Sequence, residues 1–307
     1  MRIAFQGAPG AYSEAAAQRA WPQAETLALE SFDDVFAAVS AGRVSHGLVP
    51  VENSIGGSIH RNYDLLLEHD LPIVAETELP VVHNLLALPG VQLASIRRVF
   101  SHPQGLAQCE QYLRRLPGVE MVATYDTAGS ARLIREGGLT DTAAIASTRA
   151  AELFGLDVLE AGIQDYADNI TRFILIAREA RTMAPPDKTS LAFALQNSPG
   201  ALFKALSVFA LREIDLTKLE SRPARGRPWE YVFYVDLAAG RDELRCGRAI
   251  VHLAEFARWV KTLGSYPSSQ TLKESRNAGP QSGVSAPMAS TSSASTRPTD
   301  LLDVSTV

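Results

Sequence analysis

Hydroxyl and amide side chains gather at the ends of predicted strands in this chain. The stretches "VPVENSIGGSI", "SHPQGLAQC" and "DNITRF" each adjoin an apolar run typical of a strand, and few of their residues titrate near neutral pH. Open α/β sheets bind ligands at strand ends of this kind. Such donors would hold an oxyanion through many hydrogen bonds, whereas a metal centre or a nucleophile–base pair needs other residue types.

The stretch "DNITRF" raises the question of why polar residues adjoin a strand. Asn169, Thr171 and Arg172 would supply an amide, a hydroxyl and a fixed cation, and a guanidinium can grip a carboxylate with two hydrogen bonds. The alternative is structural, a buried Thr and a surface Arg that enter a strand.

The stretch "VPVENSIGGSI" offers a similar choice. Four polar residues surround two glycines at the carboxyl end of a strand, which favours ligand contact: Glu52, Asn53, Ser54 and Ser58. In the alternative, the Asn and Ser side chains hydrogen-bond their own turn.

Three further stretches place donors where helices are predicted to start. "GAPGAYSEAA" puts Ser13 at a helix N-terminus, which can bind an anion, although its glycine spacing matches neither nucleotide-binding motif. "YDTAGSA" puts Thr127 at a helix start, where it would also serve as a cap. In "SHPQGLAQC", Gln104 and Gln108 would share one helix face, while His102 either acts as a general base or caps and packs, as most isolated histidines do.

Composition limits the class of protein. The 307 residues are 46% hydrophobic, enough for two domains, and 29 Lys and Arg against 34 Asp and Glu leave a net charge of −5 with no basic block for nucleic acid. Cys109 and Cys246 lack the spacing of a zinc site or a disulfide framework, so we expect buried thiols and no metal. The N-terminus lacks a signal-peptide core and no apolar run could span a bilayer, so we expect a cytoplasmic protein without a membrane partner.

The order of predicted elements indicates two domains. Residues 1–182 alternate strands and helices, which is typical of α/β layers. Pro185 and Pro186 mark a linker at 183–188, and residues 189–267 then read as βαββα, closing as a ferredoxin-like sandwich if "SYP" begins a last strand after a long helix through Gly264. Residues 268–307 are rich in Ser, Thr, Pro, Ala and Gly, which predicts a disordered tail.

Eight motifs in this order resemble monofunctional prephenate dehydratase with its C-terminal ACT regulatory domain, over the chain up to about Pro267: "GAPGAYSE", "VPVENSIGGSI", "SHPQGLAQC", "YDTAGSA", "DNITRF", "NSPGALFKAL", "LESRP" and "LGSYP". The resemblance implies a catalytic domain built like a type-II periplasmic binding protein. One lobe would comprise residues 1–78 with 158–182, and the other residues 79–157. A βαββαβ ACT domain would occupy residues 189–267.

The resemblance also implies an activity and its residues. Prephenate would lose water and carbon dioxide to give phenylpyruvate without a cofactor, and L-phenylalanine would be the effector of a homodimer or homotetramer. The implied catalytic residues are Thr171, Glu52, Asn53, Ser101 and Gln108. The implied substrate-binding residues are Ser13, Ser54, Thr127, Asn169, Arg172 and Phe173, and the implied effector-binding residues are Asn197, Pro199, Gly200, Ala201, Leu202, Glu220 and Ser221.

Two alternatives remain open from the sequence. Arogenate dehydratase would use the same fold and elimination on a substrate with an amino acid side chain. A non-catalytic amino-acid sensor could join the same lobes to an ACT domain, although a pure binder has no need of Thr171 in particular.

Overall fold

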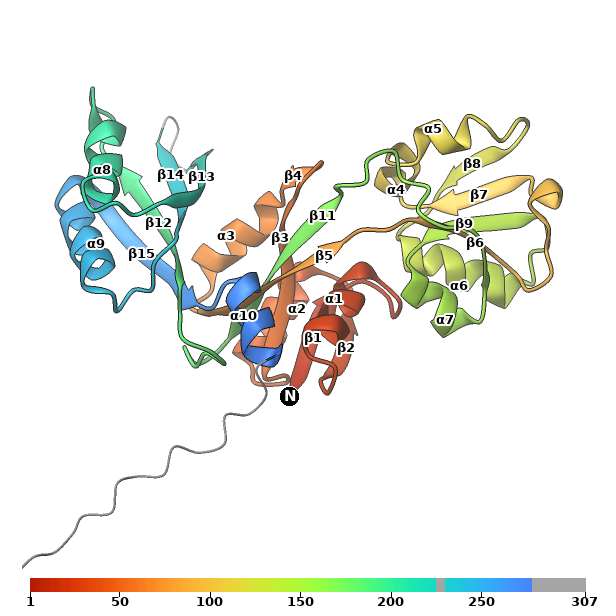
Figure 1. The fold of residues 1–307 in the computed structure, drawn as a ribbon, viewed down its shortest axis with the longest axis horizontal. Helices are drawn as coiled ribbons and strands as arrows, with labels where there is room; N and C mark the ends of the chain where they lie inside the picture. The colour runs from red at the N-terminus through yellow and green to blue at the C-terminus, as the bar shows by residue number, and fades with distance from the viewer. Residues whose placement is uncertain (225–229, 278–307) are drawn as a thin grey trace, which may run out of the picture.

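The computed structural model describes residues 1–224 and 230–277, and Figure 1 shows two lobes followed by a separate C-terminal domain on the far side of the first lobe. The first lobe has the strand order β2-β1-β3-β11-β5, with β4 paired to β3. Its strands are β1 (Arg2–Gln6), β2 (Glu25–Leu29), β3 (His46–Asn53), β4 (Gly57–Ser58), β5 (Ile73–Pro80) and β11 (Ile170–Ala177). Since β11 follows the second lobe in sequence, the chain leaves the first lobe after β5 and returns to it.

Helices cover both faces of the first sheet. One face packs Phe36 and Leu65 against Val49 and Ile174, and the opposite face packs Ala17 against Leu48 and Leu175, as well as Leu272 from near the end of the described chain. The helices of this lobe are α1 (Tyr12–Ala20), α2 (Phe32–Ser40) and α3 (His60–Glu68). The alternation of buried residues along β11 therefore gives the strand two distinct faces.

The second lobe repeats the α/β pattern on a sheet ordered β10-β6-β9-β7-β8. Its strands are β6 (Asn84–Ala87), β7 (Arg98–Ser101), β8 (Glu120–Ala123), β9 (Thr142–Ala146) and β10 (Asp157–Glu160), and its helices are η1 (Leu93–Ser95), α4 (Pro103–Ala107), α5 (Glu110–Leu113), α6 (Thr127–Gly137) and α7 (Thr148–Phe154). The predicted return to the first lobe at residue 158 is wrong, because β10 pairs antiparallel with β6, Val158 opposite Leu86. The two crossings are residues 81–83 and 161–169.

The C-terminal domain is an antiparallel sheet ordered β13-β14-β12-β15 with two helices. Its elements are β12 (Lys188–Leu195), α8 (Ala201–Ala210), β13 (Leu216–Pro223), β14 (Tyr231–Leu237), α9 (Leu244–Phe256) and β15 (Ala257–Tyr266). This is the predicted βαββαβ order. The long final helix is wrong, since α9 ends at Phe256 and residues 257–266 pair with β12. That pairing outweighs the helix-like spacing of apolar residues there.

Residues 268–277 also depart from the prediction. Instead of a disordered tail, helix α10 (Ser269–Asn277) follows β15 and returns to the first lobe, where Leu272 is buried against its core. Ser268 anchors the turn through Asp187, with its backbone N 2.6 Å from Oδ1. The rest of the predicted tail, residues 278–307, lies outside the described residues.

Cys109 and Cys246 are buried free thiols, as predicted. Among the helices that the structure describes, none combines the length and apolar character needed to cross a membrane.

Candidate active site

A cavity of about 370 Å³ lies where the two lobes meet. Its wall draws on both lobes and on the first crossing, and six predicted site residues line it: Ser13, Asn53, Gln108, Thr127, Thr171 and Phe173. Strands β3 and β11 bring the central pair together, with Thr171 directly opposite Asn53 in antiparallel register. Strand ends far apart in sequence thus converge on one site.

A bulge in β3 aims these side chains. The register shifts between Arg172 and Phe173, so that Pro50 opposes Phe173 and Asn53 opposes Thr171, with Val51 as the extra residue. Pro50 and Asn53 both line the cavity although they are three residues apart, a spacing that places them on opposite faces of a regular strand. Bulges often re-aim side chains beside active sites.

The amide of Asn53 is fixed by its own turn. Its Oδ1 accepts hydrogen bonds from the backbone N–H groups of Ile55, at 3.1 Å, and Gly56, at 2.7 Å. Because those groups can only donate, Nδ2 must face the other way, toward Thr171 Oγ1 at 3.0 Å. The Thr171 oxygen therefore accepts from Asn53, and its own hydrogen is left to donate into the cavity.

A second run of hydrogen bonds extends this order across the lobes. Asn53 Nδ2 lies 2.7 Å from Asn169 Oδ1, and Asn169 Nδ2 lies 3.3 Å from Gln108 Oε1. His83 Nε2 lies 2.8 Å from the same Gln108 oxygen, so this ring nitrogen is the donor. Gln108 lines the cavity, and its amide nitrogen takes no part in these two hydrogen bonds.

His83 and Tyr12 are site residues that sequence reasoning missed. The Tyr12 hydroxyl lies 2.8 Å from His83 Nδ1 and 2.9 Å from the Val82 carbonyl oxygen, so its one hydrogen is shared between two acceptors when Nε2 carries the ring proton. Burial lowers the pKa of His83 and raises that of Tyr12 well above its usual value, so both are neutral at pH 7. The only sequence signal was an isolated His after a strand. His102 lines the cavity and caps α4, its Nδ1 accepting from Gln104 N at 3.2 Å, the role expected of an isolated histidine.

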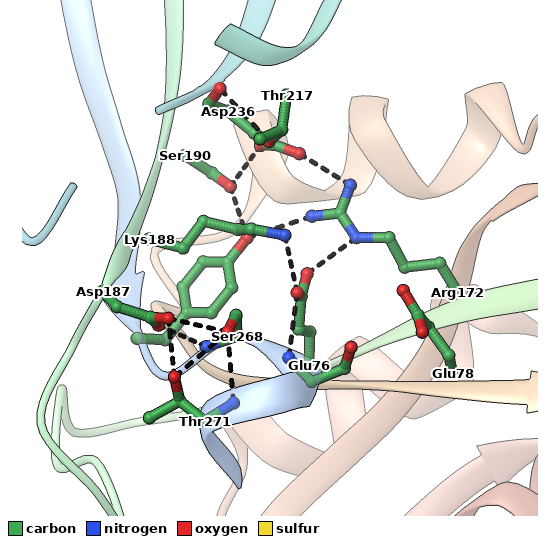
Figure 2. A network of polar contacts seen from close by, with 12 residues as sticks. Glu76, Glu78, Arg172, Asp187, Lys188, Ser190, Thr217, Asp236, Ser268 and Thr271 are labelled. Carbon is green, nitrogen blue, oxygen red and sulfur yellow. Dashed lines mark hydrogen bonds and ion pairs between the residues drawn. The ribbon is translucent and has the colours of Figure 1, made fainter. Parts of the chain in front are cut away.

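Arg172 and Glu52 do not face the cavity, which corrects their predicted roles. They oppose each other in the register of β11 and β3, one residue from the Thr171–Asn53 pair, and strand alternation turns them to the other face of the sheet. There Arg172 Nε lies 2.7 Å from Glu76 Oε2 and Nη1 lies 2.6 Å from Asp236 Oδ2 (Figure 2). Glu52 Oε1 pairs with Lys218 Nζ at 3.0 Å.

Three other predicted residues support the site without lining the cavity. Ser101 is fully buried and donates to the Ile145 carbonyl at 2.9 Å. Ser54 joins the turn after β3 to the second crossing, donating to Asp168 O at 2.6 Å and accepting from Ile170 N at 2.9 Å. Asn169 acts through Asn53 and Gln108, as described above.

Thr127, which was expected to cap its helix, is the first residue of α6. The cap is Asp126, whose carboxylate accepts a hydrogen bond from Gly129 N.

The predicted effector residues separate into two places. Asn197, Ala201 and Leu202 line a pocket of about 140 Å³ in the C-terminal domain, beside the turn of Pro199 and Gly200, where Gly200 has a φ of 78° that favours glycine. Glu220 instead contacts the first lobe through Ser58 and through His60 Nε2, at 2.9 Å. Burial alone would raise the pKa of Glu220, but the Ser58 hydrogen bond and the Lys218 charge hold it below its usual value. Ser221 lies on the exposed face of β13.

Within residues 1–224 and 230–277, no three His, Cys, Asp or Glu side chains are grouped as a metal site.

Comparison with known proteins decides the family. The family model for prephenate dehydratase matches residues 3–181. This chain belongs to the prephenate dehydratase family. Membership confirms the predicted enzyme class, a hydro-lyase of phenylalanine biosynthesis.

Three relatives show how far the similarity extends. Arogenate dehydratase/prephenate dehydratase 6, chloroplastic, from Arabidopsis thaliana is 50% identical over 289 residues, which cover 88% of this chain and 70% of the relative. The crystal structure of prephenate dehydratase from Arthrobacter aurescens in complex with L-Phe has 31% identity and a TM-score of 0.81, covering 88% of this chain and 91% of that one. The structure of GqqA, described as a novel type of quorum quenching acylase, has 38% identity and a TM-score of 0.81, covering 88% and 98%.

Proposed function

We propose that this chain converts prephenate to phenylpyruvate, with Thr171 donating a hydrogen bond to the leaving hydroxyl. The observation that carries the proposal is the orientation of Asn53, which makes the Thr171 oxygen an acceptor and leaves its hydrogen for the cavity. In the reaction, the bond to the ring carboxylate breaks, its electron pair enters the ring, and the C–O bond to the hydroxyl breaks. A proton joins the departing oxygen, giving water and carbon dioxide, so neither an oxidant nor a reductant is needed.

Neutral donors would hold the substrate carboxylates. Within the described part of the chain, the residues lining the cavity include no Lys or Arg. The Gln108 amide and the N-terminal turns of α1 and α6, which carry Ser13 and Thr127, offer N–H and O–H groups, and helix N-termini favour anions. Donors fixed before the substrate arrives stabilise developing charge without reorganising.

Arogenate is the second candidate substrate. Asp126 places a carboxylate on the cavity wall, where it could pair with the ammonium group that distinguishes arogenate from prephenate. The Arabidopsis relative at 50% identity also carries arogenate dehydratase in its name. The acylase activity in the description of GqqA belongs to that protein. Since Thr171 is contacted by an amide, which cannot take its proton as a general base, we propose no role for Thr171 as the nucleophile of an acyl hydrolysis.

The C-terminal domain is the proposed site of regulation by L-phenylalanine. The Arthrobacter structure in complex with L-Phe supports L-phenylalanine as the effector, and the small pocket beside Asn197 and the Pro199–Gly200 turn supports this domain as its site. A second copy of the chain would bring the exposed Ser221 face to a neighbour, in a homodimer or homotetramer that sedimentation would measure. The cytoplasmic location stays a prediction, and the Arabidopsis relative is named chloroplastic.

The test is turnover by the purified chain. Prephenate and arogenate are supplied separately, beside enzyme-free controls, and phenylpyruvate and phenylalanine are quantified with and without added L-phenylalanine. Phenylpyruvate formed from prephenate and slowed by L-phenylalanine supports the proposal. Product from arogenate alone changes the substrate, and no product from either would favour the sensor.

A further inference from the structure

Two neighbouring residue pairs on β3 and β11 face opposite sides of the first sheet. Asn53 and Thr171 form the pair on the cavity side, and Glu52 and Arg172, next in register, form the pair on the other side. Any shift of Glu52 or Arg172 along or across the sheet moves Asn53 or Thr171 with it, because adjacent Cα atoms are 3.8 Å apart across a rigid peptide. The two pairs are mechanically one unit.

Glu52 and Arg172, the pair on the side away from the cavity, contact the C-terminal domain of the same chain. Arg172 contacts Asp236 of β14 at 2.6 Å (Figure 2). It also donates to Tyr266 of β15, whose hydroxyl lies 3.2 Å from Nη2. Glu52 reaches Lys218 of β13 at 3.0 Å. Three of the four strands of that domain thus contact Glu52 or Arg172, the neighbours of Asn53 and Thr171.

The contacts of Arg172 are stiff because they are buried and paired, whereas the Glu52 side chain is 38% exposed and depends on the buried Lys218. The exposed fractions of Glu76, Asp236 and Tyr266 are 1%, 5% and 0%. Glu76 also accepts from Lys188 Nζ at 2.6 Å, and Asp236 Oδ1 accepts from Ser190 Oγ at 2.5 Å. Burial disfavours the guanidinium charge, yet Asp236 and Glu76 raise the pKa of Arg172 above its usual value. Breaking such an ion pair would leave a buried charge without a partner, which costs free energy. The Arg172 side chain therefore resists displacement.

We propose that Glu52 and Arg172 are positioning residues through which the C-terminal domain fixes Asn53 and Thr171 in the geometry for elimination. The inference rests on the proposed function of Thr171 and adds a role for the domain in basal turnover. It also gives the effector a route. Lys218 lies on the less exposed face of β13, opposite to the exposed Ser221 face, so a ligand that shifts β13 would move Lys218 and Glu52 with it, and hence move Asn53 relative to Thr171.

The experiment changes C-terminal residues that touch no substrate. Asp236→Asn and Lys218→Met remove the charges that hold Arg172 and Glu52, and we expect kcat to fall about tenfold or more, since sub-ångström misplacement of reacting groups is costly, with KM within about twofold. Lys218→Arg keeps the charge and should retain kcat. Arg222→Gln is the matched control. It breaks another contact between the domains, with Asp64 of α3 at 2.5 Å, but does not reach β3 or β11.

Hydrogen exchange provides a readout independent of turnover. Peptides covering residues 48–54 and 168–175 should exchange faster in Asp236→Asn and Lys218→Met than in the wild type, and at the wild-type rate in Arg222→Gln. Circular dichroism confirms that each variant is folded. If the Asp236→Asn and Lys218→Met variants fold and both peptides exchange at the wild-type rate, the inference is wrong. This test does not depend on turnover. A wild type that converts neither substrate would overturn only the proposed function. Wild-type kcat in both variants would overturn the inference equally.

Discussion

At the scale of single residues, the Asn53 amide decides what Thr171 can do. Two backbone N–H groups fix its oxygen, so its nitrogen donates to Thr171 and the Thr171 hydrogen is available to an acceptor in the cavity, which we propose is the leaving oxygen. A threonine hydroxyl is a weak acid, but a fixed donor strengthens its hydrogen bond as negative charge develops on the departing oxygen. In the proposed reaction, such a site would bind the transition state more tightly than the substrate.

His83 gives a pH dependence at the same scale. Burial lowers the pKa of its imidazole in the folded protein, whereas the unfolded chain titrates near the usual value of about 6.5. Above that pH both states are neutral. Below it the unfolded state binds a proton that the folded state refuses, so the free energy of unfolding falls as pH falls, by at most about 1.4 kcal/mol per pH unit from this residue.

Urea unfolding between pH 7.5 and 5.0 measures this effect. The His83→Gln variant keeps an amide donor for Gln108 and cannot titrate, so its unfolding free energy should depend less steeply on pH than that of the wild type. Parallel curves for the two proteins would show that His83 does not carry the dependence.

At the scale of elements, the motifs of the sequence located the strand ends correctly but not the faces of the strands. Thr171, Asn53 and Gln108 line the cavity as expected, while Glu52 and Arg172 point to the C-terminal domain. Alternation alone argues that Arg172 cannot share a face with Thr171. The side of the sheet on which Asn53 lies, however, depends on the bulge at Val51, and no residue type in the stretch predicts that bulge.

The predicted boundaries of elements were wrong where contacts between distant parts of the chain determine them. β10 joins the second lobe because it pairs with β6, and residues 257–266 form a strand because β12 provides a partner. The sequence did not predict His83 as a site residue because its partners, Tyr12 and Gln108, come from different lobes. The sequence therefore sufficed for the family-level fold and for most of the cavity wall, but not for long-range pairing.

Helix α10 gives a test at this scale. A chain ending at Pro267 loses the burial of Leu272 and the hydrogen bond from Ser269 N to Glu76 Oε1 at 3.1 Å. We expect its free energy of unfolding to fall by about 2–5 kcal/mol, the usual result of deleting one buried Leu and one buried hydrogen bond. The control is a chain ending at Asn277, which keeps α10. Equal unfolding free energies in urea would mean that α10 adds nothing to the packing.

At the scale of the whole molecule, contacts between lobes and contacts between domains meet at the same site. Tyr12 of the first lobe, His83 of the first crossing, Gln108 of the second lobe and Asn169 of the second crossing form one hydrogen-bonded run that ends at Asn53. The C-terminal domain holds the opposite face of the same strands. The relative placement of all three units therefore determines the geometry around Thr171.

The most direct test of the account is the turnover of Thr171→Val in the intact chain, beside the wild type, on prephenate and on arogenate. Valine keeps the shape and removes the donor, and Asn53 Nδ2 retains Asn169 as partner, so unfolding free energy should change by no more than about 1 kcal/mol. We expect a loss of kcat of about 100- to 1000-fold, the usual effect of deleting one fixed donor to a developing oxyanion, with KM little changed. A folded variant with near-wild-type kcat would contradict it.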